Sequence, residues 1–451
     1  MKKECTFITM TIIFCSILLI TTQKSYAYSY SLLQTQDFFA SAPFQYEIAS
    51  TFNPLGSGAR AMGRGGACIA ACDDCTAINW NPGLLIKLIK PEFSFVYNNK
   101  INVESISFGA YPESGGTNST TDDNIHFMSF SYPFRLGGYN WVISFSYQEL
   151  FDFDRAWNFT INKTSYLEKI DYVQTGSLSA LSVAYCMQLL SNLSFGMSFN
   201  IWDNDLTKNK WRQHYHNTLH SKTSIFSNNY EKVEEYEFSG WNVNIGALCQ
   251  YHDWSVGVLL KTPFKANIQH SISTTSLDQF GPEINQSKNT YFFNEELKMP
   301  LSYGLGVSYA IQNNFFVSAD VYKTHWNNFV LIDEGGNEIS PITGKSLSKT
   351  NTKPTHQVRL GMEYHYIDQI RELIIPLRCG LFYDPAPAAN NPDDFYGLTF
   401  GFGLSKDFFS VDFAYQFRFA NNVGTFIHES WDFSQDIREH NIYMSMILYW
   451  K

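Results

Sequence analysis

The sequence has little charge and, after its first residues, no long apolar run. Charged residues make up 16% of the chain, against about 25% in a typical soluble domain. Beyond residue 27 no segment approaches the roughly 18 apolar residues that indicate a transmembrane helix, so we expect none in the mature protein. The net charge is −10, which argues against a nucleic-acid partner, because binding phosphate groups requires a basic surface.

Local signatures of catalysis and of metal binding are also missing. No Gly-x-Ser-x-Gly motif is present, and a hydrolase without a local signature is only a distant alternative, so we do not expect an enzyme. His214, His216 and His220 lie close together, but metal binding requires a fixed geometry, and residues 203–235 are predicted to form a mobile polar loop. We therefore interpret these side chains as surface histidines and predict neither a metal site nor a cofactor.

The first residues are typical of a Sec signal peptide. Lys2 and Lys3 form a basic start, residues 7–20 are mostly apolar, and small residues precede a cleavage site after Ala27. The alternative, an uncleaved anchor helix, fits less well, because the apolar run is shorter than the roughly 20 residues that span a bilayer. We expect a protein that is exported to the cell outer membrane of a diderm bacterium and loses residues 1–27.

From residue 93 onward, apolar residues alternate with polar or small ones in segment after segment. One such run has Leu193, Phe195, Met197, Phe199 and Ile201 separated by Ser194, Gly196, Ser198 and Asn200. Successive side chains of a strand point to opposite faces, so each segment has one apolar and one polar face. A soluble β-sandwich shows this pattern too, but these segments run about 10 residues or more, whereas soluble strands average about 5–6. With aromatic residues at 17%, the sequence predicts an all-β transmembrane barrel.

The links between the segments alternate between short and long, as in bacterial outer-membrane barrels with short periplasmic turns and long outer loops. We predict fourteen strands, at 92–111, 124–134, 139–149, 174–189, 192–202, 236–251, 253–265, 299–311, 313–326, 354–367, 371–384, 394–405, 408–420 and 438–450. The predicted long loops are 112–123, 150–173, 203–235, 266–298, 327–353, 385–393 and 421–437. The last strand has an alternating apolar face that ends at Trp450, typical of the signal read by the barrel assembly machinery. Lipids of the outer membrane would surround the barrel.

Between the predicted signal peptide and the first strand, residues 28–91 do not alternate. They contain the run 58–67 (GARAMGRGGA), then Asp73 and Asp74, then 80–85 (WNPGLL). This order resembles the signature of FadL-type outer-membrane transporters of long-chain fatty acids and aromatic hydrocarbons. Later segments at 299–306, 359–364 and 378–384 resemble that family as well, but each of them alone is a weaker signal.

The resemblance implies a barrel of fourteen strands whose N-terminal segment folds into the lumen as a hatch, or plug. Physics supports a plug, because an empty barrel of this size would leave a wide aqueous channel. The domains are then a signal peptide at 1–27, a hatch at 28–91 and a barrel at 92–451. The motif residues of the hatch are Gly58, Arg60, Gly63, Gly65, Gly66, Asp73, Asp74, Asn81, Pro82 and Gly83.

Two features depart from the family pattern. Gly83 stands where the family usually has Ala, and three cysteines stand where it has small residues. Cys68, Cys72 and Cys75 have the C-x3-C-x2-C spacing of radical-SAM cluster ligands, but an exported chain without a parallel α/β pattern argues against a cluster. A disulfide within this trio fits an oxidising periplasm, and three small buried residues are the other possibility.

The function that the resemblance implies is passive uptake of a hydrophobic small molecule, either a long-chain fatty acid or an aromatic hydrocarbon. The ligand would be captured among the outer loops, enter an apolar pocket, displace the hatch and leave sideways through the wall. The alternative is a non-transporting barrel of the same superfamily that serves in secretion or surface attachment, since the motif does not discriminate between the two.

Charged residues on the polar faces of neighbouring strands complete the predicted site. We expect a ladder of ion pairs in the lumen, built from Arg359, Glu363, Arg378, Asp412 and Arg418. A fatty-acid carboxylate could instead be bound by Arg359 or Arg378, because an arginine pairs well with a carboxylate. This substrate-binding role is a hypothesis.

Overall fold

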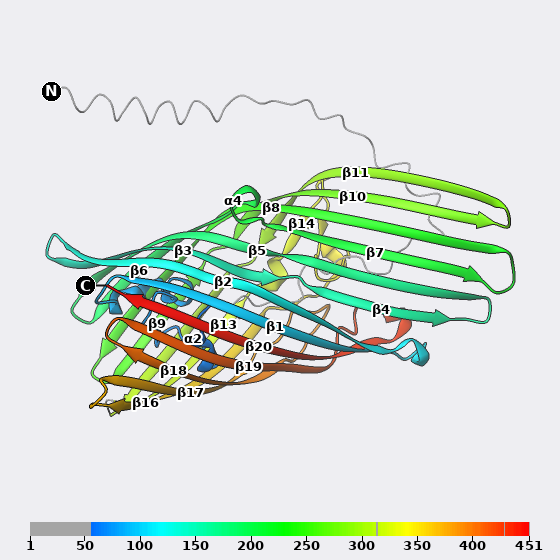
Figure 1. Ribbon diagram of the computed structural model, residues 1–451. Coiled ribbons are helices and arrows are strands. Elements are labelled where there is room, and N and C mark those ends of the chain that lie inside the picture. Colours follow the sequence, from blue (N-terminus) through cyan, green and yellow to red (C-terminus); the bar gives the residue numbers. More distant parts are fainter. Residues whose placement is uncertain (1–55, 313, 428, 451) are drawn as a thin grey trace, which may run out of the picture. The chain divides into compact units, whose positions relative to one another are not determined.

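Fourteen antiparallel strands close into a barrel, in a computed structural model that describes residues 56–312, 314–427 and 429–450 (Figure 1). Each wall strand pairs with the next, and the last pairs back to the first. The predicted count is confirmed. In order around the wall the strands are β1 (Glu92–Phe108), β2 (Gly116–Leu136), β3 (Tyr139–Asp152), β5 (Tyr166–Leu190), β6 (Leu193–Trp202), β8 (Phe226–Tyr251), β9 (Trp254–Lys261), β12 (Ser302–Ile311), β13 (Phe315–Thr324), β16 (Thr355–Asp368), β17 (Leu373–Tyr383), β18 (Tyr396–Lys406), β19 (Phe409–Val423) and β20 (Phe433–Tyr449).

The predicted signal peptide and residues 28–55 of the predicted hatch lie outside the described residues. In the part of the chain that the structure describes, no helix is long and apolar enough to cross a membrane.

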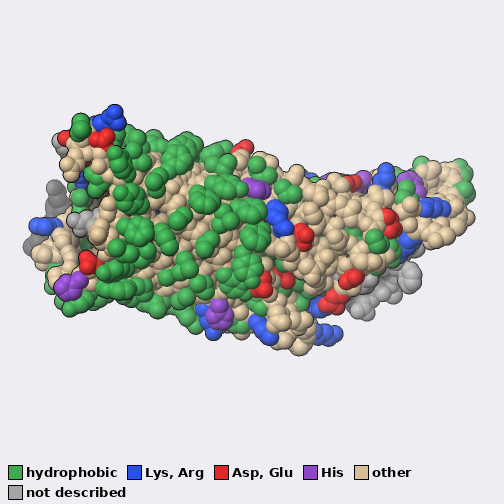
Figure 2. Space-filling model, turned by 90° about the horizontal axis from the view of Figure 1, so that it is seen from below, with side chains coloured by type: hydrophobic (Ala, Val, Ile, Leu, Met, Phe, Trp, Pro, Cys, Tyr) green, Lys and Arg blue, Asp and Glu red, His purple; other side chains and the backbone are tan. Residues whose placement is uncertain are grey.

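The alternation seen in the sequence becomes an inner and an outer face of the wall. On β16, Arg359 and Glu363 point into the barrel and are buried, whereas Leu360 and Met362 point outward and are each 50% exposed. Figure 2 shows hydrophobic side chains gathered over one part of the surface, next to a part that is mostly polar. Such an apolar outer belt around a polar interior is the surface that a bilayer requires.

Tight turns join the strands at the end of the barrel where the C-terminus lies (Figure 1). Gly137 and Gly138, between β2 and β3, have φ values of +63° and +85°. His252, between β8 and β9, has φ +51°. Two-residue hairpins favour this left-handed conformation because its twist matches that of the flanking strands. The short links predicted at these two places are therefore confirmed as turns.

Hairpins extend the wall at the opposite end, where the sequence predicts loops (Figure 1). Most residues of 150–173, 203–235 and 266–298 are strand. The expectation of a mobile loop was wrong, because these polar residues pair backbone to backbone with their neighbours and alternate too little in hydrophobicity to be recognised. His214, His216 and His220 accordingly lie on a strand. The additional strands are β4 (Arg155–Asn162), β7 (Lys210–Ser221), β10 (Phe264–Phe280), β11 (Glu283–Met299), β14 (Val330–Ile332) and β15 (Glu338–Ile339).

Residues 56–91, here called the internal segment, lie inside the barrel. They contain α2 (Ala59–Gly63), α3 (Ala77–Trp80) and the 3-10 helix η2 (Pro82–Lys87). Their buried hydrogen bonds reach inward-facing groups on opposite parts of the wall, such as Ser194 on β6 and Thr399 on β18. Short helices also occur between strands, namely η3 (Pro112–Ser114), α4 (Asn204–Thr207), η4 (Trp326–Asn328), η5 (Leu347–Lys349) and η6 (Glu429–Trp431).

The outer belt leads to a first prediction. Replacing Leu360 by Arg puts a charge on the lipid-facing surface, so we expect the free energy of unfolding to fall by about 2–4 kcal/mol. Urea titration of the barrel folded in lipid vesicles measures the loss. Phe292→Arg is the matched control, because Phe292 lies on the polar hairpin β10–β11 and is already 77% exposed. Equal losses at both positions would contradict a lipid-facing belt at Leu360.

Candidate functional site

The internal segment rests on wall positions that have no side chain. A methyl group on Gly257 would overlap the carbonyl oxygen of Ile69, and one on Gly380 would overlap the backbone at Gly65. Only glycine allows so close an approach of two backbones. The wall glycines that contact the segment lie on seven different strands and are Gly196, Gly246, Gly257, Gly304, Gly306, Gly361, Gly380 and Gly401. The segment is therefore fitted to the wall over much of its circumference.

Buried hydrogen bonds fix the turn of the segment at residues 68–72. The backbone N–H groups of Cys68 and Ile69 donate to one carboxylate oxygen of Asp320 on β13, at 2.5 and 2.8 Å. The Asn81 amide donates to the carbonyl oxygens of Ile69, at 2.7 Å, and of Ala247 on β8, at 3.0 Å. Asn81 thus ties two parts of the segment to each other and to the wall, as a single side chain with two donors can.

The charged motif residues take part in the ion pairs of the lumen. Arg60 lies 3.0 Å from Asp73 and 3.8 Å from both Asp74 and Asp412, measured between nitrogen and carboxylate oxygen. Arg64 lies 2.8 Å from Glu363. Because Asp412 and Glu363 belong to β19 and β16, these pairs join the segment to the wall. A buried charge without a partner is costly. The arginines of the segment and the carboxylates of the wall therefore stabilise each other.

The predicted ladder of wall charges is present. Arg378 reaches Glu363 at 2.9 Å and Asp412 at 2.7 Å, and Arg418 reaches Asp384 at 3.4 Å. Asp412 also faces Arg60, and Glu363 also faces Arg64. The ladder and the internal segment therefore form one network.

Arg359 and Arg378, the two predicted ligand-binding arginines, are directed to protein groups. The Arg359 guanidinium donates to the carbonyl oxygen of Gly65 at 2.9 Å, lies over the Phe382 ring and is 3.6 Å from Asp384. The side chains of Arg359 and Arg378 are 0% and 1% exposed. These contacts hold the internal segment in place. A role of either arginine in ligand binding stays a prediction.

The remaining motif residues shape the backbone of the segment. Gly58 precedes α2 with φ +103°, and Gly65 and Gly66 follow it at +70° and +72°. Pro82 begins η2, where its missing N–H is not needed. The carbonyl oxygen of Gly83 accepts a hydrogen bond from Ser194 at 2.7 Å. Together with Gly63, which faces Gly401 on β18, all ten motif residues thus lie inside the barrel.

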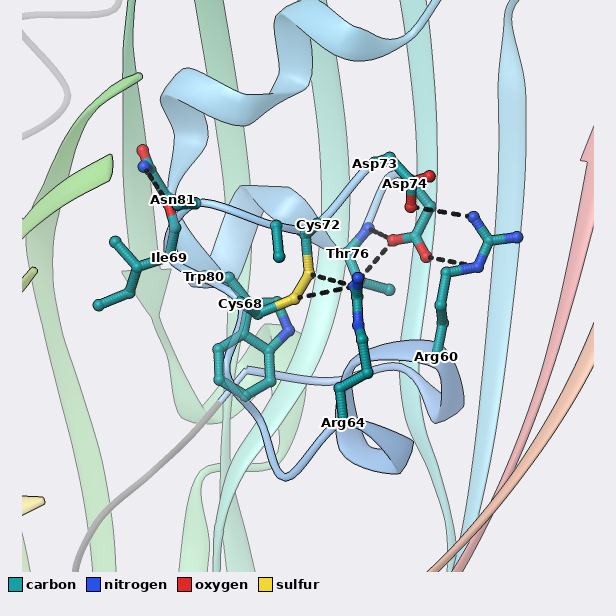
Figure 3. The surroundings of a disulfide bond; sticks show 12 residues. Arg60, Arg64, Cys68, Ile69, Cys72, Asp73, Asp74, Thr76, Trp80 and Asn81 are labelled. Carbon is teal, nitrogen blue, oxygen red and sulfur yellow. Dashed lines mark hydrogen bonds and ion pairs between the residues drawn. A yellow bond between two sulfur atoms is a disulfide. The ribbon is translucent and has the colours of Figure 1, made fainter. Parts of the chain in front are cut away.

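Two of the three motif cysteines form a disulfide. Cys68 and Cys72 are bonded to each other, and the Arg64 guanidinium lies 3.6 and 3.9 Å from their sulfur atoms (Figure 3). The sequence left a disulfide within this trio open, and the structure places it at this pair. Cys75 remains a thiol, buried, with its sulfur 3.2 Å from a carboxylate oxygen of Glu92, and so matches the other possibility of a small buried residue.

A cavity with aromatic walls, here called the aromatic cavity, lies between the internal segment and several wall strands. It encloses about 900 Å³ of empty space, part of it open solvent. Its apolar lining includes Trp80, Phe151, Trp202, Phe264 and Trp326, and its amides include Asn79, Gln148, Asn200, Asn242 and Asn244. A pocket of large apolar side chains with a few polar groups is the usual form of a small-molecule site.

A second cavity of about 700 Å³, here called the charged cavity, is lined by ionisable side chains such as Lys100, Asp152, Arg418 and Glu439. Leu150 and Phe151 line both cavities. They follow a β-bulge in β3, where the register with β5 shifts after Glu149. A bulge re-aims side chains, and here it places an apolar partition between the two cavities.

Sequence reasoning did not identify the residues of the aromatic cavity. They come from the internal segment and from strands and links spread over residues 148–357, and only the closed barrel brings them together. A signal was nevertheless present. Trp202 stands at an inward-facing position at the outer end of β6, where the other inward positions are small or polar.

Solved structures with the same fold include three transport proteins. The Pseudomonas putida toluene transporter TodX is 13% identical, with a TM-score of 0.55 over 88% of this chain and 99% of TodX. The Ralstonia pickettii toluene transporter TbuX is 14% identical, with a TM-score of 0.52 over 88% of this chain and 100% of TbuX. The monoaromatic hydrocarbon channel CymD is 14% identical, with a TM-score of 0.52 over 88% of this chain and 99% of CymD.

The predicted resemblance to FadL-type barrels is therefore confirmed for the fold. No protein-family model matches the sequence, and a search of curated proteins finds no match. At such low identity the shared fold says nothing about the ligand, which has to be inferred from the cavity itself.

The fit between segment and wall leads to a second prediction. Gly257→Ala places a methyl group against the Ile69 carbonyl and pushes the 68–72 turn away from β9. If the segment closes the lumen, ion conductance through the purified barrel in planar bilayers rises several-fold. Gly116→Ala is the control, because no atom lies within 4 Å of a methyl group there. Equal conductance of the two variants would show that the 68–72 turn does not close the lumen.

The disulfide leads to a third prediction. A loop of about five residues closed by a disulfide loses roughly 2 kcal/mol of unfolded-state entropy. We therefore expect Cys68→Ser combined with Cys72→Ser to lower the free energy of unfolding by about 2 kcal/mol, measured by urea titration without reductant. Cys249→Ser changes an exposed free thiol and should leave stability unchanged. With dithiothreitol present, the unaltered protein should unfold like the double variant, and a lasting difference would contradict this account.

Proposed function

We propose that the protein takes up hydrophobic small molecules passively across the outer membrane. The observation that carries the proposal is the aromatic cavity, which lies inside a barrel whose lumen also holds the internal segment. An apolar ligand gains nothing from a wide water-filled pore, because each CH2 group costs about 0.8 kcal/mol in water. A cavity with aromatic walls instead offers such a ligand a place to leave water.

The exterior supports a location in the outer membrane. The apolar belt fits the lipid, and the tight turns and long hairpins lie at opposite ends, as expected for periplasmic and outer faces. Export with cleavage after Ala27, and insertion by the barrel assembly machinery, belong to the same proposal. The long hairpins would then project from the cell surface and meet the ligand first.

The internal segment acts as the hatch of this proposed transporter. Its ion pairs and wall glycines hold it over much of the circumference, so complete displacement would leave several buried charges without partners. A local shift near Gly56 and Trp80, which line the aromatic cavity, would break fewer of these contacts than complete displacement. The ligand would pass this point and leave sideways through the wall.

The shape of the cavity favours aromatic ligands over long acyl chains. Trp202 and Phe264 lie with ring centroids 6.1 Å apart and planes only 19° apart, and flat ligands pack well against such rings. TodX and TbuX are toluene transporters, which agrees with this choice. The competing function is a non-transporting barrel for secretion or surface attachment, to which the projecting hairpins would also be suited.

A fourth prediction tests transport. Hydrocarbons cross plain phospholipid bilayers unaided, so uptake of labelled naphthalene is measured in cells with a lipopolysaccharide outer leaflet that express the protein. Trp202→Ala should lower the saturable rate about 2- to 10-fold, because an aromatic contact is worth roughly 0.5–1.5 kcal/mol. Phe292→Ala, outside the cavity, is the control and should have no effect.

Two results would contradict the transport proposal. Swelling of vesicles that carry the protein in sugar solutions would reveal an open porin. Naphthalene uptake no faster than in cells without the protein would favour the secretion or attachment barrel instead.

A further inference from the structure

One lysine in the lumen differs from the other cations that face it. Seven lumen cations each have a carboxylate oxygen within 4.0 Å, namely Arg60, Arg64, Lys100, Arg155, Arg359, Arg378 and Arg418. Lys87 of the internal segment instead donates to the carbonyl oxygens of Ala70 and Ala71. Lys261, at the end of β9, lines the aromatic cavity, and its ammonium group has no ion pair or hydrogen bond with any described residue. No Asp or Glu is among the described side chains that line this cavity. Among the described side chains, the aromatic cavity therefore holds one positive charge that no carboxylate compensates.

Two further polar groups of the cavity wall have no partner. The Asn79 amide nitrogen, on the internal segment, and the Tyr322 hydroxyl, on β13, are buried and make no hydrogen bond within the described structure. The two residues are only 5% and 7% exposed. A buried donor without an acceptor is destabilising, and such groups in native structures call for an explanation.

The packing brings the Tyr322 ring toward Lys261. Tyr322 forms a cluster with Ile69 and Leu259, and Leu259 is the inward-facing residue that precedes Lys261 on β9. The strand between them, β12, has Gly304 opposite Tyr322, and the Ile69 side chain fills the space over this glycine beside the ring. Lys261 and Tyr322 thus line the aromatic cavity from neighbouring parts of the wall, and Asn79 lines it from the internal segment.

We propose that the aromatic cavity binds an aromatic carboxylate, whose acid group is held by Lys261, Tyr322 and Asn79 while its ring lies among the tryptophans and phenylalanines. The inference rests on the proposed function and narrows its ligand class. A carboxylate accepts several hydrogen bonds at its two oxygens and compensates the charge of Lys261. A neutral hydrocarbon would leave the three donors unpaired in the cavity. A site built to bond a polar group binds an analogue without that group less tightly.

The test compares naphthoate with naphthalene, which have the same ring system with and without the acid group. Binding to the purified full-length protein in detergent is followed by ligand fluorescence. We expect naphthoate to bind more tightly, and Lys261→Met to weaken naphthoate binding about 10-fold or more, as for a lost bond to a charged group. Naphthalene binding should not weaken. Lys261→Arg should retain most of the naphthoate affinity.

Further variants separate a specific effect from a general one. Tyr322→Phe removes only the hydroxyl and should weaken naphthoate binding several-fold without weakening naphthalene binding. Lys265→Met is the matched control, because Lys265 is exposed, lies outside the cavity and is paired with Glu296 at 2.8 Å. It should change neither affinity. Retained heat-modifiable migration in electrophoresis confirms that each variant is folded.

The outcomes distinguish this inference from the proposed function. If naphthalene and naphthoate bind equally well and Lys261→Met leaves both unchanged, the carboxylate site is overturned while the hydrophobic cavity stands. If dodecanoate binds more tightly than naphthoate, the aromatic part of the inference is overturned. If none of the three ligands binds, the proposed function itself fails.

Discussion

Closure of the strand ladder is the constraint on which the rest of this structure depends. Inside a bilayer no water satisfies backbone N–H and C=O groups, so every one of them must be bonded within the protein. The pairing of β20 with β1 removes the last open edge of the wall. Closure then fixes two surfaces of opposite character, because successive side chains point to opposite sides. Leu360 and Met362 are left for the lipid, while Arg359 and Glu363 are enclosed in the lumen.

The enclosed charges explain why the lumen is filled in such an ordered way. Glu363 and Asp412 on the wall each face arginines from two sources, Arg378 of the wall and Arg60 or Arg64 of the internal segment. Pairing offsets the desolvation that a buried charge suffers. Wall and segment are thereby interdependent, because removing the segment would leave wall carboxylates undercompensated. The wall glycines serve the same fit sterically, since they let the two backbones touch where any side chain would intervene.

The barrel could be predicted from the sequence, but its cavity could not. The barrel depends on local sequence patterns, whereas the cavity depends on contacts between residues far apart in the sequence. Strand number, turns and the start of the wall at Glu92 depend on period-two alternation and on tight turn residues, which are local. The hairpins β7–β8 and β10–β11 escaped detection because their residues are polar on both faces, so pairing without hydrophobic alternation left no pattern. The disulfide could be narrowed to three cysteines, yet only the turn at 68–72 decides the pair. The cavity needs Trp202 and Trp326 in one lining, although they are more than a hundred positions apart in the sequence.

The lumen holds both stabilising ion pairs and an apolar path for a ligand. The separation of the two cavities suggests how both fit inside one barrel. The charged cavity holds the ion pairs of Lys100 and Arg418, and the bulge in β3 turns Leu150 and Phe151 between it and the aromatic cavity. Removing water from around charged groups carries a desolvation cost, so an apolar ligand placed among those pairs would impose that cost on them. Confining these charges to one side lets the aromatic side change its contents without disturbing the ion pairs of the charged cavity. On this view the bulge matters as much as the motif, because it keeps those ion pairs apart from the ligand.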